Sequence, residues 1–257
     1  MPSLQATLRH KSILDTIQAR GNARVGELAD QLGVSSVTIR ADLDYLESQH
    51  LLSRTRGGAV PVRPLRFELP MEIASQDNPD SKRRIGAAAA KLVRDGETVI
   101  IDVGSTLMEV AQALPPSLTD VVVVTNGLKV ALSLENHPGV TVVVTGGTLR
   151  PTQHSLVAPY GQLLLKHVNA DIAFLGSSGV DPVKGFTNTN LAEAEVKHTM
   201  IEASDRVVFC CDSTKLMRVA TAHICSIDRP DLMITDQPAP PEALRAMRRK
   251  GLDVQVV

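Results

Sequence analysis

Apolar residues in the first fifty positions recur at helical spacing in three groups: Ile13, Leu14 and Ile17; Val25, Leu28, Ala29 and Leu32; and Ile39, Leu43 and Leu46. They predict one helix over 8–19, a short second helix that Gly33 ends, and a third helix from a cap at Ser35 to about Ser48. Two helices joined by a short turn containing glycine are typical of a helix-turn-helix. The alternating stretch 51–60 contains two adjacent glycines, Gly57 and Gly58, and predicts a β-hairpin beside these helices.

The remaining chain alternates short β-branched runs with helical stretches. Four prolines between 61 and 80 predict a linker, and an alanine-rich helix is expected over 81–94. The expected strands are Val99–Val103, Val121–Val124, Val140–Thr145, Ile172–Leu175, Val207–Cys211, Leu232–Thr235 and Val254–Val257. Apolar strands that alternate with helices predict a mostly parallel sheet covered on both faces. The fold class is therefore α/β, with a small helical domain in front of a larger α/β domain.

Composition narrows the class of protein. No apolar run reaches the roughly 18 residues of a membrane span, and the first eleven residues lack the apolar core of a secretory signal, so we expect a cytoplasmic protein. The three cysteines have no metal-binding spacing, and adjacent Cys210 and Cys211 should point to opposite faces of a strand as buried thiols. We expect neither a metal nor an organic cofactor. Residues 1–66 carry a net charge of +3 and the rest −4, which suits a polyanion-binding head on an acidic body.

The third helix has the side chains of a recognition helix. Its solvent face carries Val37 and Ala41, and small, hydroxyl and guanidinium groups surround its first turns, so it can enter a major groove. The predicted DNA-binding residues are Ser35, Ser36, Val37, Thr38 and Arg40, with Arg54 and Arg56 of the hairpin near backbone phosphates. Spacing alone leaves an alternative open, because three amphipathic helices also occur in protein-docking modules and lone arginines are usually solvated.

Loops rich in glycine and hydroxyl groups follow several predicted strands. In parallel sheets ligands bind beyond the carboxyl ends of the strands, and helix N-termini there attract anions. The predicted effector-binding residues are Asp102, Gly104, Ser105 and Thr106; Thr125, Asn126 and Gly127; Gly146, Gly147 and Arg150; and Gly179, Glu193 and Lys215. Each loop alone could be a plain turn. Glu193 could equally form a surface salt bridge with Lys197, and Lys215 could be a solvent-exposed loop residue.

Both parts of the sequence resemble the DeoR family of bacterial regulators. The pattern LA..LGVS..TIR.DL..LE...L..R..GGA lies within 7–60, and IIDVGST, VVTNG, VTGG, GFTNTN and CDSTK lie within 81–236. Ala41 stands where the family commonly has a second basic residue, and Ser105 replaces a threonine. The resemblance implies a winged helix-turn-helix over 1–60, a linker over 61–80 and an effector-sensing and oligomerisation domain over 81–257. It also implies that the second domain is similar in fold to ribose-5-phosphate isomerase and CoA transferases.

These observations predict a sequence-specific regulator of a carbohydrate-utilisation operon, expected to be a repressor. Its partners are double-stranded operator DNA, a phosphorylated sugar or sugar alcohol, and further copies of itself as a dimer or tetramer, with no membrane. The alternative is a sugar-phosphate isomerase-like enzyme with a fused DNA-binding head. GSSGVD and GFTNTN lack the acidic pair and the lysine-glycine loop that such isomerases carry, so we expect no enzyme and no catalytic residues. A third possibility is a scaffold whose body only dimerises.

Overall fold

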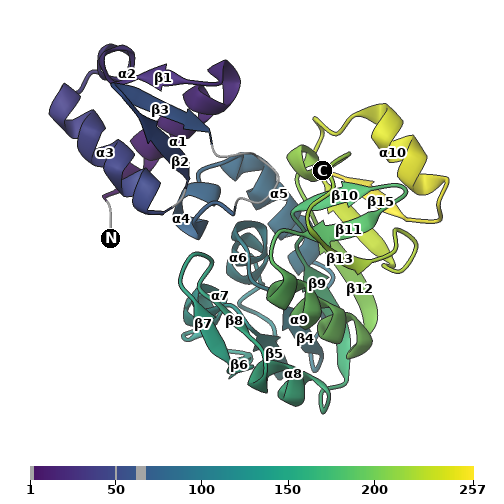
Figure 1. Cartoon of the computed structure of the whole chain (residues 1–257). Coiled ribbons are helices and arrows are strands. Elements are labelled where there is room, and N and C mark those ends of the chain that lie inside the picture. The colour runs from purple at the N-terminus through teal and green to yellow at the C-terminus, as the bar shows by residue number, and fades with distance from the viewer. Residues whose placement is uncertain (1–2, 50, 62–67) are drawn as a thin grey trace. The chain divides into compact units, whose positions relative to one another are not determined.

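The computed structural model describes residues 3–49, 51–61 and 68–257. The chain forms two compact units, Met1–Asp77 and Asn78–Val257, which we call the head unit and the sensor unit (Figure 1). Each unit has its own hydrophobic core, and each is described separately below.

The head unit is a three-helix domain with a small antiparallel sheet. Its elements are α1 (Leu4–Arg20), β1 (Ala23–Arg24), α2 (Val25–Leu32), α3 (Ser36–Ser48), β2 (Leu52–Thr55), β3 (Gly58–Pro61) and α4 (Met71–Ala74), with the strands in the order β1-β3-β2. Ile13, Leu28, Ile39 and Leu43 are completely buried in its core. This confirms the helix-turn-helix and the hairpin, and Gly33 ends α2 with a left-handed backbone as expected.

Two local features of the head unit differ from the expectation. Helix α1 begins at Leu4, before the predicted start, because the Ser3 side chain accepts a hydrogen bond from the Ala6 amide at 3.3 Å and caps it. Part of the expected linker forms α4, since Met71 and Ile73 bury their side chains and Ile73 joins the core. Residues 62–67 of the expected linker lie outside the described residues.

The sensor unit is built on a seven-stranded sheet in the order β15-β14-β12-β9-β4-β5-β6. Every neighbouring pair in it is parallel. The strands are β4 (Thr98–Ile101), β5 (Val121–Thr125), β6 (Val140–Val144), β9 (Ala170–Leu175), β12 (Ser204–Cys210), β14 (Leu232–Thr235) and β15 (Val254–Val256). They correspond to the seven strands expected from the sequence, so the mostly parallel α/β class is confirmed.

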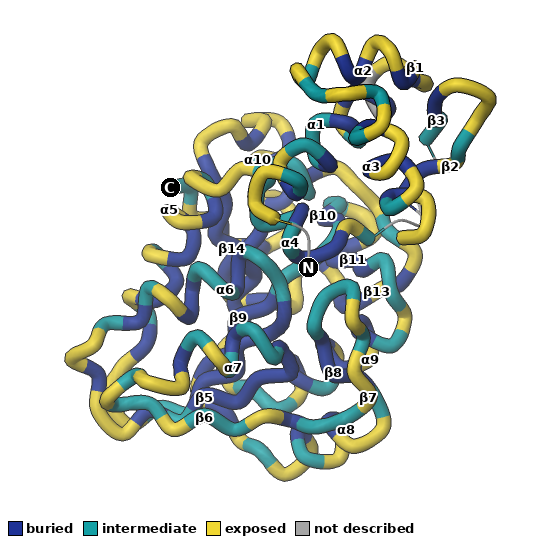
Figure 2. Tube along the Cα trace, turned by 90° about the vertical axis from the view of Figure 1, so that its left-hand side faces the viewer, coloured by how far each residue is buried: buried dark blue, intermediate teal, exposed yellow. Residues whose placement is uncertain are grey.

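Helices cover both faces of this sheet, and a hydrophobic core lies on each face (Figures 1 and 2). The helices are α5 (Pro79–Ala90), α6 (Ser105–Gln112), α7 (Leu128–Leu134), α8 (Tyr160–Leu165), α9 (Leu191–Glu202) and α10 (Pro241–Arg248), with a 3₁₀ turn η2 (Ser213–Lys215). Cys210 belongs to one core and Cys211 to the other, which confirms that their side chains point to opposite faces. Burial raises the pKa of Cys211 to about 11 and that of Cys225 to about 12.

Five short strands of the sensor unit were not expected. They are β7 (Thr148–Arg150) paired with β8 (Ser155–Val157), and β10 (Gly179–Asp181), β11 (Gly185–Asn188) and β13 (Ala222–Cys225), which form a second antiparallel sheet. Each is only three or four residues long, and those between 146 and 190 lie in segments whose glycine, threonine and asparagine residues favour loops. Within the described residues, no helix is long and apolar enough to cross a membrane.

Candidate functional site

The exposed side of α3 in the head unit presents the residues predicted to contact DNA. Ser35 caps the helix and accepts from the Thr38 amide at 3.1 Å, while its hydroxyl lies 2.9 Å from that of Thr38. The Val37 side chain is 71% exposed, and Arg40 is exposed one turn further on. An exposed valine at the start of a helix has no role in the core, so it is free to meet a thymine methyl in a major groove.

Arg54 is already bonded inside the head unit. Its Nη1 lies 3.1 Å from Asp44 Oδ1 and donates to the Arg40 carbonyl at 3.3 Å. Its backbone amide donates to Glu47 at 2.7 Å. These bonds tie β2 to α3, so Arg54 positions the hairpin against the helix. Arg56 is exposed at the hairpin turn, where a cation can meet a phosphate.

A buried cluster joins α1 to the inward side of α3. Asp42 accepts from Arg9 Nε at 2.6 Å and from Arg9 Nη2 at 3.0 Å, and His10 Nε2 lies 2.8 Å from the same carboxylate. The His10 ring also stacks on Tyr45, with the ring centres 4.9 Å apart. The sequence did not predict this cluster, which fixes the orientation of α3 against α1.

The strand order of the sensor unit indicates where a ligand would bind. From β4 the chain first builds outward through β5 to β6, and then returns to the other side of β4 with β9. The loops that follow β4 and β9 therefore leave the sheet in opposite directions, and in open α/β sheets such a switch point is where a crevice for ligands generally lies. Asp102 follows β4 and Gly176 follows β9, and the Gly176 amide donates to Asp102 Oδ2 at 3.1 Å across this point.

Asp102 is completely buried and forms an ion pair with Lys197 of α9. Burial raises the pKa of Asp102, while Lys197 and the Gly176 amide act in the opposite direction. In the part of the chain that the structure describes, Asp102 Oδ1 has no hydrogen-bond partner. A buried carboxylate oxygen costs free energy unless a donor serves it, so this oxygen is available to a hydrogen-bond donor from outside the protein, such as a water molecule or a ligand.

Glu193 lies one turn before Lys197 on α9 and is also buried. It pairs with Arg150, accepts from Ser155 Oγ at 2.5 Å, and accepts from Asn188 Nδ2 at 3.2 Å. Burial raises the pKa of Glu193, but Lys197, Ser155, Arg150 and Asn188 together outweigh it, and the pKa lies below its ordinary value. A surface salt bridge between Glu193 and Lys197 is therefore wrong, because both side chains are buried and Lys197 pairs with Asp102.

The β4 and β5 loops lie beside this cluster. Gly104 precedes α6 with a φ of 140°, and no side chain of the described residues caps that helix. Asn126 accepts from the Val103 amide at 3.0 Å, and Thr125 accepts from the Gly127 amide at 3.0 Å. Both Thr125 and Asn126 are buried, so they hold the loops in place, whereas Gly104 and Ser105 are partly exposed beside the first amides of α6.

The other predicted effector residues lie in different surroundings. Thr106 is buried in α6, and Gly146 is partly exposed after β6. A side chain at Gly147 would clash with the Val157 carbonyl, and one at Gly179 with the Arg218 carbonyl, so close packing accounts for both glycines. Lys215 is half-buried in η2, whose loop is held by Asp236 accepting from the Ser213 amide at 2.6 Å. The structure does not place Lys215 in contact with the Asp102–Glu193 cluster.

Four members of the cluster were not predicted: Lys197, Ser155, Asn188 and Gly176. The spacing of Glu193 and Lys197 carried a usable signal, since residues four apart share a helix face. It was ambiguous because the sequence does not say which face is buried.

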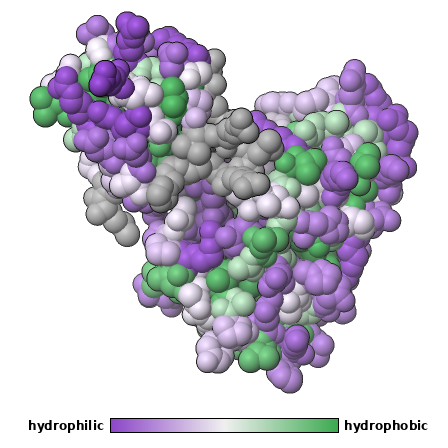
Figure 3. Space-filling view, viewed as in Figure 1, coloured by the Kyte–Doolittle hydropathy of each residue, from purple (hydrophilic) through white to green (hydrophobic). Residues whose placement is uncertain are grey.

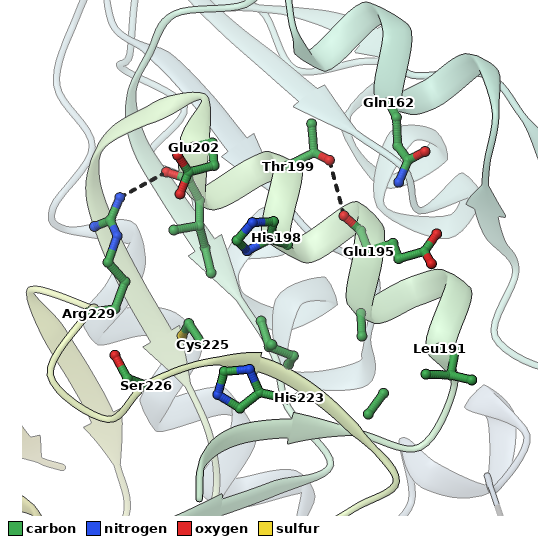
Figure 4. A pocket seen from close by; sticks show the side chains of 14 residues that line it. Gln162, Leu191, Glu195, His198, Thr199, Glu202, His223, Cys225, Ser226 and Arg229 are labelled. Atoms are coloured by element: carbon green, nitrogen blue, oxygen red, sulfur yellow. Dashed lines mark hydrogen bonds between the residues drawn. The ribbon is translucent and has the colours of Figure 1, made fainter.

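The outer side of α9 borders a separate hollow of about 620 Å³ (Figure 4). Glu195, His198 and Glu202 line it from the helix, opposite His223 and Arg229 of the β13 region. None of the predicted effector residues lines it. No group of three metal-ligating side chains occurs among the residues that the structure describes.

The two units together define a class of protein: a winged helix-turn-helix followed by an α/β unit with a buried charged cluster at its strand ends, which is the arrangement of a ligand-responsive DNA-binding regulator. Family models agree with each unit. The model of the DeoR-like helix-turn-helix domain matches residues 9–64, and that of the DeoR C terminal sensor domain matches residues 77–237. The chain belongs to the DeoR family of transcriptional regulators.

Known proteins resemble the chain over nearly its full length. The HTH-type transcriptional regulator GlpR of Haloferax volcanii is 34% identical over 246 residues, 96% of either chain. The glycerol-3-phosphate regulon repressor of Escherichia coli is 29% identical over 253 residues, 98% of this chain and 100% of that protein. Among solved structures, ribose 5-phosphate isomerase A from Methanocaldococcus jannaschii is 19% identical, with a TM-score of 0.41 over 54% of this chain and 55% of that one.

Proposed function

We propose that the protein is a cytoplasmic repressor of a carbohydrate-utilisation operon, released from its operator when a phosphorylated sugar or sugar alcohol binds the sensor unit. The repressor of the glycerol-3-phosphate regulon is a relative over the whole chain, which favours a phosphorylated effector of this kind. The effector would lie in the crevice between the β4 and β9 loops, beside the first turn of α6.

The observation that carries this proposal is the buried charge cluster at the crevice. Asp102, Lys197 and Glu193 are each at least 96% buried by side chain, and Arg150 completes two ion pairs. Buried ion pairs contribute little net stability compared with apolar residues of the same size. Three buried charges, joined by the partly exposed Arg150, at this edge of the sheet are better explained by recognition of hydroxyl groups, with α6 supplying amides for a phosphate.

The direct test compares two glutamates on one helix. Glu193→Gln changes a residue of the cluster, whereas Glu195→Gln makes the same chemical change on the exposed side of α9. A panel of sugar phosphates and sugar-alcohol phosphates is screened by thermal shift against both variants and the unchanged protein. We expect one compound to raise the melting temperature of the protein and of Glu195→Gln, and to have a much smaller effect on Glu193→Gln. No shift with any compound, or equal shifts in both variants, contradicts the proposed site.

The lowered pKa and the hydrogen bonds of Glu193 favour ligand binding without catalysis. A general base that removes a proton from a sugar carbon works best with a pKa near the working pH. The pKa of Glu193 is lowered, and each of its two oxygens already accepts a hydrogen bond. Incubation of the protein with ribose 5-phosphate should give no isomerisation; turnover that Glu193→Gln abolishes would establish an enzyme instead.

The proposed DNA contacts use the exposed part of α3 and the hairpin. Val37 and Arg40 would meet base edges, and Ser36, Thr38 and Arg56 would meet phosphates. Two heads in a symmetric oligomer would read half-sites about one helical turn, or a multiple of it, apart. The effector can lower operator affinity only by its preference for one of two arrangements of the protein, typically about 1–3 kcal/mol of coupling.

A further inference from the structure

Strand β6 is an open edge of the large sheet. It lies at the end of the strand order, and among the described strands it pairs with β5 alone. Its residues are Val-Thr-Val-Val-Val, and all five are exposed or partly exposed, in contrast to the buried β4. In Figure 2 this difference is visible where the tube passes from the inner strands to β6.

The outward-facing hydrogen-bonding groups of β6 can be assigned to particular residues. The Thr145 amide donates to the Thr125 carbonyl at 3.0 Å, and the Val121 amide donates to the Gly139 carbonyl at 3.1 Å. In a parallel ladder alternate residues of a strand serve one neighbour, so residues 139, 141, 143 and 145 face β5. The amides and carbonyls of Val142 and Val144, and the carbonyl of Val140, therefore point away from the sheet.

This edge has none of the usual protection against pairing. Exposed edges are normally blocked by charged side chains, proline or a bulge, and Val140–Val144 contains no charge and no proline, with an unbroken register to β5. Two copies of this strand can therefore approach each other without charge repulsion. The strand also fits itself about a two-fold axis through Val142: Val142 meets its own copy, Val140 meets Val144, and Thr141 meets Val143.

Apolar side chains continue from the strand onto neighbouring segments of the sensor unit. Val144 is 40% exposed, Leu149 of β7 47%, and Leu163 of α8 54%. Helix α8 lies directly against the end of β6, since a side chain at Gly161 would meet the Gly146 carbonyl at 2.9 Å. Apolar residues are exposed on the lower part of the sensor unit in Figure 3, in the region where Figure 1 shows β6, β7 and α8. In a symmetric pair these exposed side chains would add apolar contact to that of the strands themselves.

We infer that β6 pairs antiparallel with β6 of a second copy of this chain, so that two sensor units share one continuous sheet. The interface is isologous: Val142 of each copy exchanges both backbone hydrogen bonds with its counterpart, and α8 and β7 flank the paired strands. This pairing fixes the two sensor units about a symmetry axis independently of any effector.

Proline substitution tests the pairing through backbone groups. Val142→Pro removes an outward amide and leaves the β5 ladder intact, which edge strands tolerate. The matched control is Val256→Pro in β15, at the opposite edge of the sheet. The Val257 amide and the Asp253 carbonyl form hydrogen bonds with β14, so the Val256 amide between them points outward, as the Val142 amide does. Analytical ultracentrifugation of the full chain should show Val142→Pro with half the mass of the unchanged protein, and Val256→Pro with the unchanged mass. The proposed pairing of β6 is overturned if the unchanged protein is a monomer, or if the two variants have equal masses.

A cross-link provides a readout that does not depend on disruption. In an antiparallel hydrogen-bonded pair the Cα atoms lie about 5.5 Å apart, which is within the range of a disulfide. Val142→Cys should therefore give a covalent dimer on mild oxidation, visible on a non-reducing gel, while Val256→Cys should stay monomeric on the same gel. The three native cysteines are buried and do not compete. If the protein is an oligomer but Val142→Cys forms no cross-link, the interface lies on another surface and the proposed pairing is wrong.

Discussion

Replacing Lys197 by methionine tests the energetics of the crevice most directly. Lys197→Met keeps the length and the apolar stem of the side chain but removes the positive charge that pairs with buried Asp102. The Asp102 carboxylate then keeps the hydrogen bond that it accepts from the Gly176 amide at 3.1 Å. Removing one partner of a buried ion pair typically costs about 3–5 kcal/mol. We expect the upper half of this range, since Lys197 also lowers the pKa of Glu193, giving a loss of about a thousandfold in the folding equilibrium of the sensor unit.

The loss should depend on pH in a defined direction. Burial already raises the pKa of Asp102 in the folded protein, and removing Lys197 raises it further. A carboxyl whose pKa is higher in the folded than in the unfolded chain is most favourable when protonated, so stability falls as pH rises through the folded pKa. The deficit of Lys197→Met relative to the unchanged protein should therefore be larger at pH 8 than at pH 5.

Urea unfolding of the full chain, followed by circular dichroism at both pH values, measures these differences. The double variant Asp102→Asn with Lys197→Met removes both charges, and it should recover at least half of the lost stability because no unpaired charge remains. Glu195→Gln, on the exposed side of the same helix, serves as the control and should change stability by less than about 0.5 kcal/mol. A deficit below about 1 kcal/mol, or a double variant no more stable than the single one, would refute the reasoning.

Three further predictions concern other parts of the chain. Arg40→Ala should abolish footprinting of the operator while the circular dichroism spectrum stays unchanged; an intact footprint would contradict the proposed orientation of α3. Cys211 and Cys225 should resist alkylation by iodoacetamide at pH 7.5 and react fully in urea, because burial raises both pKa values far above that pH; rapid labelling of the folded protein would show that the thiols are accessible. Gly58→Ala should cost about 1–3 kcal/mol in the head unit, since its new methyl group would lie 2.2 Å from the Ala23 carbonyl, and an unchanged thermal unfolding curve would contradict this.

Much of the fold could be predicted because its signals are local. The seven β-branched runs and the three amphipathic helices each carry their own period, and glycines such as Gly33 mark where helices end. The antiparallel strands β10, β11 and β13 could not be predicted in this way. Their side chains include asparagine and threonine, and they form strands because distant segments supply the pairing, as when Phe186 pairs with Cys225.

The sequence predicted where the candidate site lies, but it did not predict which charged side chains pair with one another there. The rule for ligand positions in parallel sheets indicated the loops after β4 and β5, and the cluster indeed begins at Asp102. The partner of Asp102, however, lies 95 residues later on α9, and only the folded chain brings it close. Glu193 and Lys197 looked like an ordinary exposed pair, because the sequence of α9 has polar residues on both sides. Which of them faces inward is decided by the packing of α9 on the sheet.

In α3, the side chains that hold the helix in the domain differ from those proposed to contact DNA, and this affects how the protein could come to bind a different operator. The Asp42 side chain bonds α3 to α1, and the Asp44 and Glu47 side chains bond α3 to the hairpin. The side chains of Val37, Arg40 and Ala41 take no part in these bonds. With α3 in the proposed orientation on DNA, substitutions at these outward positions would alter which base pairs are preferred while leaving the domain folded. The proposed operator preference could therefore change without a change of fold.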